Sequence, residues 1–256
     1  MDLALKGKII IVTGGSKGIG YGICACLVKE GAIPIIVGRN KQTIIQAVET
    51  LSQKEIAVGH VFAELTDPKQ CQAAVDTVIK EYGQIDGLVN NAGVNDSIGL
   101  ESGSHQAFTE SIQRNLTHYY LMAHHALPAL KKSKGAIVNI GSKTAFTGQG
   151  GTSGYAAANG GRNALTREWA VELLPYAIRV NAVIVAECYT PLYKKWIGTF
   201  SNPEKKLEAI KLSDLLSKRY IDNKRKKLQT EMERAKAEGN EQKEAQLFEE
   251  FIKLTT

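Results

Sequence analysis

Short runs of β-branched and aliphatic residues alternate through the first 200 residues with longer stretches in which apolar positions recur at helical spacing. Several runs are apolar throughout, as strands buried on both faces of a parallel sheet are. Six strands are predicted, over residues 8–13, 33–38, 57–62, 87–91, 135–141 and 178–185. Helices are predicted between them, over residues 19–30, 42–53, 69–82 (capped by Asp67 and Pro68), 105–131 and 155–174. This alternation predicts an α/β fold with a doubly wound parallel sheet.

The chain changes character near residue 201. Residues 201–256 hold 13 Lys/Arg and 11 Asp/Glu among 56 positions and a single glycine, Gly239. A Gly-Asn pair interrupts this charged run, which predicts a helical hairpin over residues 213–238 and 241–254. We therefore expect a first domain over residues 1–200 and a charged helical tail over residues 201–256.

The mixed signs of charge in the tail predict a solvated face, and nucleic-acid binding is not expected. No seventh strand is predicted after residues 178–185. The edge of that strand is then open unless the tail or a partner chain covers it. A splice of two unrelated coding segments would give the same change in composition.

Composition narrows the function classes further. The chain is 43% hydrophobic and 23% charged, which is typical of a soluble globular protein. Its longest aliphatic run, residues 9–12, is far below the roughly 20 apolar residues of a membrane span, so a cytoplasmic protein without a membrane segment is expected. The net charge of +6 suits a phosphate-bearing cofactor or a nucleic acid without distinguishing them. No metal is expected, because neither the four cysteines nor the histidines at 105, 118, 124 and 125 have a ligand spacing.

A glycine-rich turn follows the first predicted strand and opens the first helix. It reads Thr-Gly-Gly-Ser-Lys-Gly-Ile-Gly over residues 13–20. Glycines let the backbone approach a pyrophosphate, and the helix N-terminus offers unpaired N–H groups and a positive dipole end. Because strand, turn and helix occur in this order within a βαβ unit, a dinucleotide site is favoured over a plain tight turn.

Polar side chains follow two other strands. Asn90, Asn91, Ala92 and Gly93 come at and after the end of the fourth strand, Ser142 follows the fifth, and Tyr155 comes 13 positions later. The carboxyl ends of parallel strands form the ligand crevice of an open sheet, so these residues are predicted to line it. Asn115 lies in the long helix predicted over residues 105–131, so its position in the sequence does not place it in the crevice.

In these motifs, ordered over about residues 5–193, the chain resembles the short-chain dehydrogenase/reductase family. The segments 143–154 and 168–175 resemble the sugar dehydrogenases that act on L-fucose and related aldoses. The resemblance implies a Rossmann-type sheet and hydride transfer between a nicotinamide cofactor and a sugar or secondary alcohol. It also implies a homodimer or homotetramer. A 3-oxoacyl carrier-protein reductase is the enzymatic alternative.

The resemblance implies a role for each motif. Ser142 would bond the substrate oxygen and Tyr155 would pass the proton, with Asn115 and the residue at position 159 completing the catalytic set. The nicotinamide ribose would be supported by Asn90 and Gly93, and Asn91 and Ala92 between them would also bind the cofactor. The phosphates would lie against Gly14, Ser16, Gly18, Ile19 and Gly20, with the positive charge of the cofactor-binding Lys17 nearby.

Position 159 departs from the family, whose members have a lysine four residues after the tyrosine. A phenol titrates near pH ~10 and needs a positive neighbour to act as a base near neutrality. Asn159 carries no charge, so a cofactor-binding pseudoenzyme is the alternative reading. Lys143 and Arg162 are the nearby cations in the sequence. Arg162 lies two helical turns after Tyr155 and would have to reach back past Asn159, so it is not expected to substitute.

Two further positions bear on the ligands. Arg39 stands after the second strand, where a carboxylate would hold the adenosine ribose of NAD, and with Lys17 it favours NADP over NAD. A solvent-facing arginine is the alternative. Glu64 and Leu65 occupy the position that the family uses beside the adenine.

The segment after the sixth strand contains Glu187 and Thr190. A carboxylate at the crevice suits a polyol substrate better than an acyl chain. The alternative is a surface glutamate before a mobile lid. Thr190 is expected to meet the cofactor's pyrophosphate or carboxamide. The tail resembles the helical C-terminal end of bacterial primases, which implies a protein partner for it.

Overall fold

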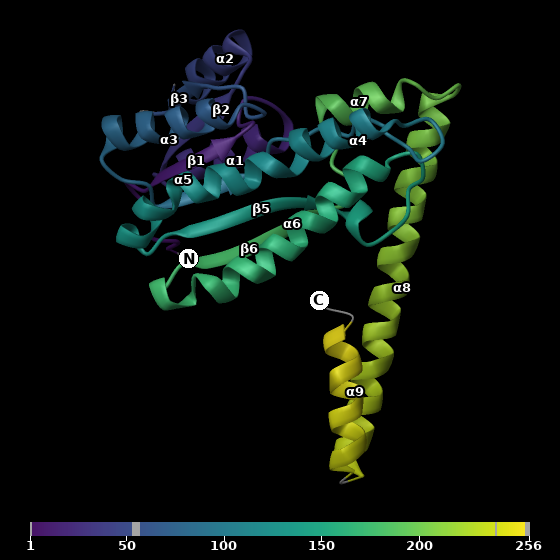
Figure 1. The fold of residues 1–256 in the computed structure, drawn as a ribbon. Coiled ribbons are helices and arrows are strands. Elements are labelled where there is room, and N and C mark those ends of the chain that lie inside the picture. Colours follow the sequence, from purple (N-terminus) through teal and green to yellow (C-terminus); the bar gives the residue numbers. More distant parts are fainter. Residues whose placement is uncertain (1, 53–56, 239, 254–256) are drawn as a thin grey trace. The chain divides into compact units, whose positions relative to one another are not determined.

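The protein forms two compact units in a computed structural model that describes residues 2–52, 57–238 and 240–253 (Figure 1). The units are Met1–Pro191, which contains the sheet, and Leu192–Thr256, which contains the tail helices. The division between the units falls after Pro191, whereas the predicted domain boundary is after residue 200. Among the described residues, no helix has both the length and the apolar character that a membrane crossing requires.

Six parallel strands form one sheet in the order β3-β2-β1-β4-β5-β6. The predicted α/β class and its parallel sheet are therefore confirmed. The third strand is shorter than predicted, because its ladder with β2 begins at Gly59 opposite Ile35. The strand order reverses between β1 and β4, so their carboxyl ends flank the crevice where doubly wound sheets bind ligands. The bounds are β1 (Ile9–Thr13), β2 (Ile33–Gly38), β3 (Gly59–Phe62), β4 (Gly87–Asn90), β5 (Ala136–Ser142) and β6 (Arg179–Val185).

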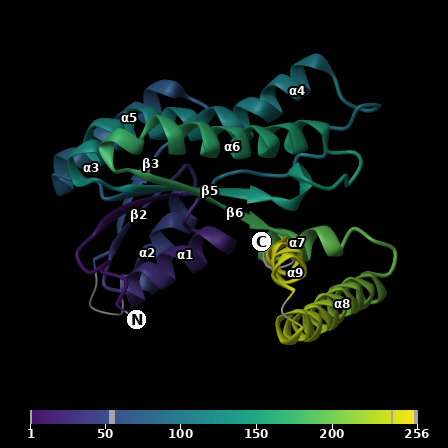
Figure 2. The ribbon, with the colours of Figure 1, turned by 90° about the horizontal axis from the view of Figure 1, so that it is seen from below.

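Helices cover both faces of the sheet (Figure 2). Side chains of a strand point alternately to opposite faces, so Ile9 and Ile11 of β1 belong to one apolar core and Ile10 and Val12 to the other. The first core includes α3 (Pro68–Tyr82), α5 (His118–Ser133) and α6 (Ser153–Glu172). The second includes α1 (Gly18–Lys29) and α2 (Lys41–Ser52).

Two predicted helices differ from the structure. The helix expected over residues 105–131 is present as α4 (His105–Ile112), the π-helical turn η1 (Gln113–Thr117) and α5, which continues to Ser133. Apolar spacing does not reveal such a turn, because the chain remains helical through it. The helix expected over residues 155–174 is α6, and it ends before a 3-10 turn at Leu174–Tyr176.

Strand β6 forms an edge of the described sheet. It pairs only with β5 there, and Val183 and Ile184 are 51% and 40% exposed. The described residues form no seventh strand, in agreement with the open edge predicted for this strand. An edge of this kind presents unpaired backbone groups and apolar side chains.

Three helices follow the sheet: α7 (Pro191–Ile197), and in the tail α8 (Pro203–Ala237) and α9 (Glu241–Lys253). The first helix of the predicted hairpin begins at Pro203 rather than at residue 213, because Asn202 caps it by accepting a hydrogen bond of 2.9 Å from the N–H of Lys205. The α8–α9 hairpin is as predicted. Lys224 and Glu250 join its two helices by an ion pair of 3.1 Å, and Leu228 is buried.

Candidate active site

The backbone of the glycine-rich turn depends on glycine at three positions. Gly14 and Gly18 have φ of +66° and +54°, a region that side chains other than glycine rarely adopt. A side chain at Gly20 would overlap the carbonyl group of Gly14 and the amide of Asn91. Lys17 is the N-cap of α1 and makes no capping bond with its side chain, so that side chain satisfies none of the first N–H groups of the helix. The turn therefore fits the phosphate-binding role that the sequence predicted for it.

The ends of β1 and β4 are tied together beside this turn. The Oγ1 of Thr13 accepts hydrogen bonds from the N–H groups of Asn91 (2.9 Å) and Ala92 (3.1 Å). The Nδ2 of Asn91 donates to the carbonyl oxygens of Thr13 (2.9 Å) and Gly14 (3.3 Å). The segment that carries Gly93 is thereby held next to the glycine-rich turn.

Several residues predicted to bind the cofactor use their side chains for contacts within the protein. The Nδ2 of Asn90 donates to the carbonyl oxygen of Tyr119 (3.3 Å) and to Oδ1 of Asn139 (3.0 Å), so this buried side chain points into the core. Ile19 packs against the core, and the hydroxyl of Ser16 lies 3.3 Å from that of Thr43.

The residues predicted to meet the adenosine form an ion pair. Nη1 of Arg39 donates to Oε2 of Glu64 at 2.9 Å, and the Arg39 side chain is 75% exposed. Burial raises the pKa of Glu64, but the hydrogen bonds from Arg39 and Thr66 outweigh it and lower this pKa overall. Leu65, next in the chain, is buried in the first core.

Tyr155, Asn159 and Arg162 share one face of α6. Asn159 is fully buried, and its Nδ2 donates to the carbonyl oxygen of Tyr155 at 2.8 Å. Its Oδ1 accepts a hydrogen bond of 3.0 Å from Nη1 of Arg162. Both ends of the Asn159 amide are thus engaged within the protein. Tyr155 itself lies in the first turn of α6 and is half-buried.

The guanidinium of Arg162 is enclosed, with 3% of the residue exposed. Its Nε donates to the carbonyl oxygen of Asn115 at 2.8 Å, and its Nη2 donates to the same oxygen. Nη1 also donates to the carbonyl oxygen of Ile140 at 3.0 Å, and the group lies 4.2 Å from the ring centre of Tyr119. Arg162 therefore joins α6 to η1, α5 and β5.

Asn115 lies in the π-helical turn η1 and is fully buried. Its side-chain Oδ1 accepts a hydrogen bond of 2.8 Å from the N–H of Val94. A π-helical turn lengthens the local hydrogen-bond spacing and releases backbone groups for other partners. Here the Asn115 carbonyl receives Arg162, so Asn115 connects the Gly93–Val94 segment to α6.

Ser142 and Tyr155 lie on elements that pack against each other. Ser142 ends β5 and caps the 3-10 turn η2 (Lys143–Ala145), and its Oγ accepts a hydrogen bond of 3.3 Å from the N–H of Thr144. The turn η2 contacts α6, which carries Tyr155. Both side chains are half-buried, as a crevice that admits substrate requires.

The two predicted residues after β6 also lie at this end of the sheet. Glu187 forms an ion pair with Lys143, and both side chains are partly exposed. Thr190 lies against the glycine-rich turn, since a Cβ at Gly18 would be 3.4 Å from the Cβ of Thr190. The roles predicted for Glu187 and Thr190 remain predictions.

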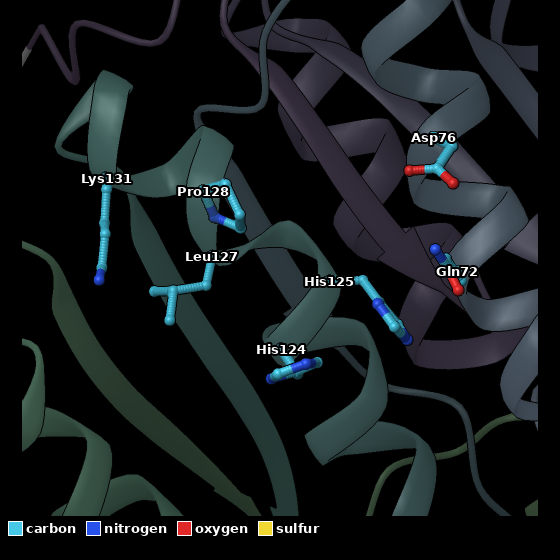
Figure 3. A pocket seen from close by; sticks show the side chains of 7 residues that line it. All are labelled: Gln72, Asp76, His124, His125, Leu127, Pro128 and Lys131. Atoms are coloured by element: carbon cyan, nitrogen blue, oxygen red, sulfur yellow. The ribbon is translucent and has the colours of Figure 1, made fainter.

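Of the histidines considered as metal ligands, one begins α4 and three lie on α5. His118 is buried; burial and the charge of Arg162 lower its pKa to about 3, and its Nε2 bonds the carbonyl oxygen of Arg114 at 3.0 Å. In the part of the chain that the structure describes, no three His, Cys, Asp or Glu side chains gather as metal ligands. A hollow between α3 and α5 (Figure 3) is lined by Gln72, Asp76, His124, His125, Leu127, Pro128 and Lys131.

The sequence motifs did not reveal the contacts of Arg162. A charged residue seven positions after Tyr155, in a stretch of small residues, was the available signal. Its partners come from η1, α5 and β5, which are distant in the chain.

Comparison with known proteins gives consistent matches. The family model of the short chain dehydrogenases matches residues 8–199. The L-fucose dehydrogenase of Rattus norvegicus is 31% identical over 199 residues, which cover 77% of this chain and 72% of that protein. The 3-oxoacyl-acyl-carrier-protein reductase of Thermotoga maritima is 31% identical over 225 residues, covering 81% and 90%. A crystal structure described as Cj0485 dehydrogenase has a TM-score of 0.76 at 43% identity and covers 82% of this chain and 80% of that chain.

Proposed function

The chain belongs to the short-chain dehydrogenase family, and from this premise we propose that it moves a hydride between NADP(H) and a hydroxyl-bearing carbon of an L-fucose-like aldose. The family match confirms the predicted oxidoreductase and the predicted family. Two parts of the proposal go beyond the family match. Glu187 supports an aldose as the substrate, and Arg39 supports NADP over NAD as the cofactor.

The observation that carries the proposal is the grouping of the motifs at the carboxyl end of the sheet. The glycine-rich turn is tied to the segment after β4 through Thr13 and Asn91. Ser142 ends β5 at the same edge, and Tyr155 begins the helix that packs on the turn after Ser142. The backbone proposed to bind the phosphates and the side chains proposed to exchange the proton are thus carried by elements that meet at this end of the sheet, which supports hydride transfer as the reaction.

The chemistry divides between the cofactor and the chain. A bound nicotinamide supplies the hydride acceptor or donor. In the oxidative direction, the Ser142 hydroxyl holds the carbinol oxygen and Tyr155 accepts its proton as the carbon loses its hydride. In the reductive direction Tyr155 returns the proton to the carbonyl oxygen. Glycines 14, 18 and 20 let the backbone contact the diphosphate without a side chain in the way.

The acidic residue at the crevice favours a sugar. Glu187 is partly exposed and paired with Lys143, so a carboxylate and an ammonium are both available to hydroxyl groups there. An acyl chain offers neither group a hydrogen-bonding partner. The relative from Rattus norvegicus agrees with this choice, while the relative from Thermotoga maritima keeps the carrier-protein reductase as the second candidate.

A substrate panel tests the proposal. NADP⁺ is offered with L-fucose, D-arabinose and galactose, and NADPH with a β-ketoacyl thioester. We expect turnover of at least one aldose, and we expect Glu187→Gln to raise KM for it about three- to tenfold, the loss of one charge-assisted hydrogen bond. Turnover of the thioester alone would replace the aldose by the second candidate.

We further propose that copies of this chain associate in the cytoplasm. Phe108 on α4, Tyr120 on α5 and Val171 on α6 are 40%, 49% and 75% exposed. Packing against a second copy would remove these apolar side chains from water. Light scattering coupled to gel filtration tests this directly, and a monomer at micromolar concentration would contradict it.

A further inference from the structure

A buried positive charge without an acidic partner lies beneath the candidate site. Arg162 is 3% exposed, and none of the ion pairs among the described residues includes it. Its hydrogen-bond acceptors are carbonyl oxygens of Asn115, Ile140 and Asn159. A buried cation held only by dipoles is costly, so a negative group that forms next to it is strongly stabilised.

The aromatic neighbours of Arg162 do not supply that negative group. Burial raises the pKa of Tyr119 to about 12, and the phenol donates a hydrogen bond of 2.9 Å to the carbonyl oxygen of Ile140. His118 is neutral, because burial and Arg162 lower its pKa to about 3. Both groups are uncharged near neutral pH, so they leave the charge of Arg162 uncompensated.

The guanidinium lies at the site rather than far behind it. A Cβ at Gly93 would be 2.8 Å from Nη2 of Arg162, so the segment predicted to support the nicotinamide ribose rests on this group. Asn159 links the guanidinium to the carbonyl oxygen of Tyr155. The guanidinium also lies 4.2 Å from the ring centre of Tyr119, whose hydroxyl donates to the same Ile140 carbonyl oxygen as Nη1 of Arg162.

We propose that Arg162 is the positioning residue whose positive charge stabilises the phenolate of Tyr155, with Asn159 and Asn115 holding the guanidinium in place. This inference rests on the proposed function, in which Tyr155 exchanges the proton. The positive charge that the phenol needs is then carried by residue 162, three positions after residue 159 on α6. Asn159 holds the guanidinium in place and does not indicate a lost activity. Arg162 acts through Tyr155 and does not contact the substrate.

The site has room for one such charge. Oδ1 of Asn159 lies 3.0 Å from Nη1 of Arg162, so a longer cationic side chain at position 159 would meet the guanidinium at close range. Like charges in a buried site repel strongly. Positions 159 and 162 are therefore alternatives for carrying the cation, and this exclusivity makes the proposal testable by exchange.

Four proteins form the test: the chain as it stands, Arg162→Met, Asn159→Lys, and the double variant Asn159→Lys/Arg162→Met. We expect Arg162→Met to lower kcat about 100-fold and to change the Kd for NADPH much less than kcat, because the glycine-rich turn that would hold the phosphates is unaltered. The double variant regains most of the rate, since the cation returns at position 159. Asn159→Lys alone gains no rate and has a lower Tm. Arg162→Lys keeps part of the rate.

A second readout does not need a substrate. The absorbance of tyrosinate is followed against pH, and the difference between each protein and its Tyr155→Phe form gives the ionisation of Tyr155. We expect this midpoint to be higher in Arg162→Met than in the parent protein and to return in the double variant. Other charged or titrating groups near this face are shared by all variants: His118, Tyr119, the Arg114–Asp96 pair and the Lys143–Glu187 pair.

The outcomes separate the two proposals. An unchanged Tyr155 midpoint in a folded Arg162→Met protein overturns the role of Arg162, whatever the substrate. A lower Tm with no recovery in the double variant shows a structural arginine and also overturns it. An inactive chain that Asn159→Lys alone activates overturns it as well and supports the pseudoenzyme. A shifted midpoint without turnover of any panel substrate upholds Arg162 and rejects the proposed substrate.

Discussion

The glycine-rich turn and the Tyr155–Arg162 face of α6 serve the same candidate site by different physical means. In the turn, the proposed function lies in the backbone: positive φ at Gly14 and Gly18 and the absence of a side chain at Gly20 shape the surface. On α6, the proposed function lies in side chains, and the partners of Arg162 come from η1, α5 and β5. A site made of backbone is specified by residues that are consecutive in the chain. A charge, in contrast, can come from any position in the chain whose side chain is long enough to reach the site.

This difference predicts how each region responds to substitution. A change in the turn alters shape and therefore affects binding and folding together. A change on α6 alters charge or a single proton and therefore affects rate or pH dependence with the binding surface intact.

Tyr155→Phe is expected to have the largest effect. The phenyl ring preserves packing but cannot exchange a proton, so kcat falls by about 10²- to 10⁴-fold while the Kd for NADPH stays within about twofold. Steady-state kinetics and fluorescence titration measure the two quantities. Tyr120→Phe, on the exposed face of α5, is the matched control and keeps full rate. Retention of half the rate in Tyr155→Phe would remove this residue from the mechanism.

Gly20→Ala tests the turn. A Cβ at Gly20 would lie 2.6 Å from Nδ2 of Asn91 and 2.9 Å from the carbonyl carbon of Gly14, so the backbone must shift. We expect the Kd for NADPH to rise at least about tenfold and the free energy of unfolding to fall by about 1–3 kcal/mol. Gly22→Ala is the matched control, because a Cβ there meets no atom within 4 Å. Equal affinity of the two variants would show that the turn does not bind the phosphates.

The sequence predicted the first region better than the second. Strands and helices around the turn follow from short-range patterns, and the strict need for glycine leaves a visible signature at residues 14, 18 and 20. On α6 the sequence showed that Asn159 replaces a charge, but not that Arg162 is enclosed. That enclosure depends on the π-helical turn at Asn115, which apolar spacing did not reveal.

The tail shows the same limit in another form. Its hairpin was predictable from a charged run broken by a Gly-Asn pair, but the predicted start of the first helix, residue 213, lies after the observed one. The sequence carries a signal for the earlier start in Asn202 and Pro203, an N-cap followed by a first-turn proline. The change in composition near residue 201 gives no information on where the helix begins.

His118 makes the α6 neighbourhood sensitive to acid. Burial and Arg162 lower its pKa to about 3, whereas an exposed histidine titrates near 6.5. The unfolded chain therefore binds a proton below about pH 6.5 that the folded chain does not, and the free energy of unfolding falls by up to about 1.4 kcal/mol per pH unit toward pH 3.

Denaturant titrations between about pH 7 and pH 4 measure this slope. His118→Gln is expected to remove most of it, because glutamine does not titrate. His105→Gln, at the exposed start of α4, is the control and keeps the slope of the parent. Parallel curves for the parent and His118→Gln would mean that His118 is protonated in the fold.

The smallest expected effect concerns cofactor choice at the edge of the turn. The Arg39–Glu64 pair is largely exposed, and exposed ion pairs contribute only about 0–1 kcal/mol, so a 2′-phosphate can compete for the guanidinium. We expect Arg39→Ala to lower the preference for NADPH over NADH about tenfold, and Glu64→Gln to raise it about two- to threefold by freeing Arg39. Arg167→Ala, exposed on α6, controls for the loss of one positive charge. If Arg39→Ala and Arg167→Ala show the same preference for NADPH over NADH, then Arg39 does not recognise the 2′-phosphate, and the proposal of NADP as the cofactor loses its support.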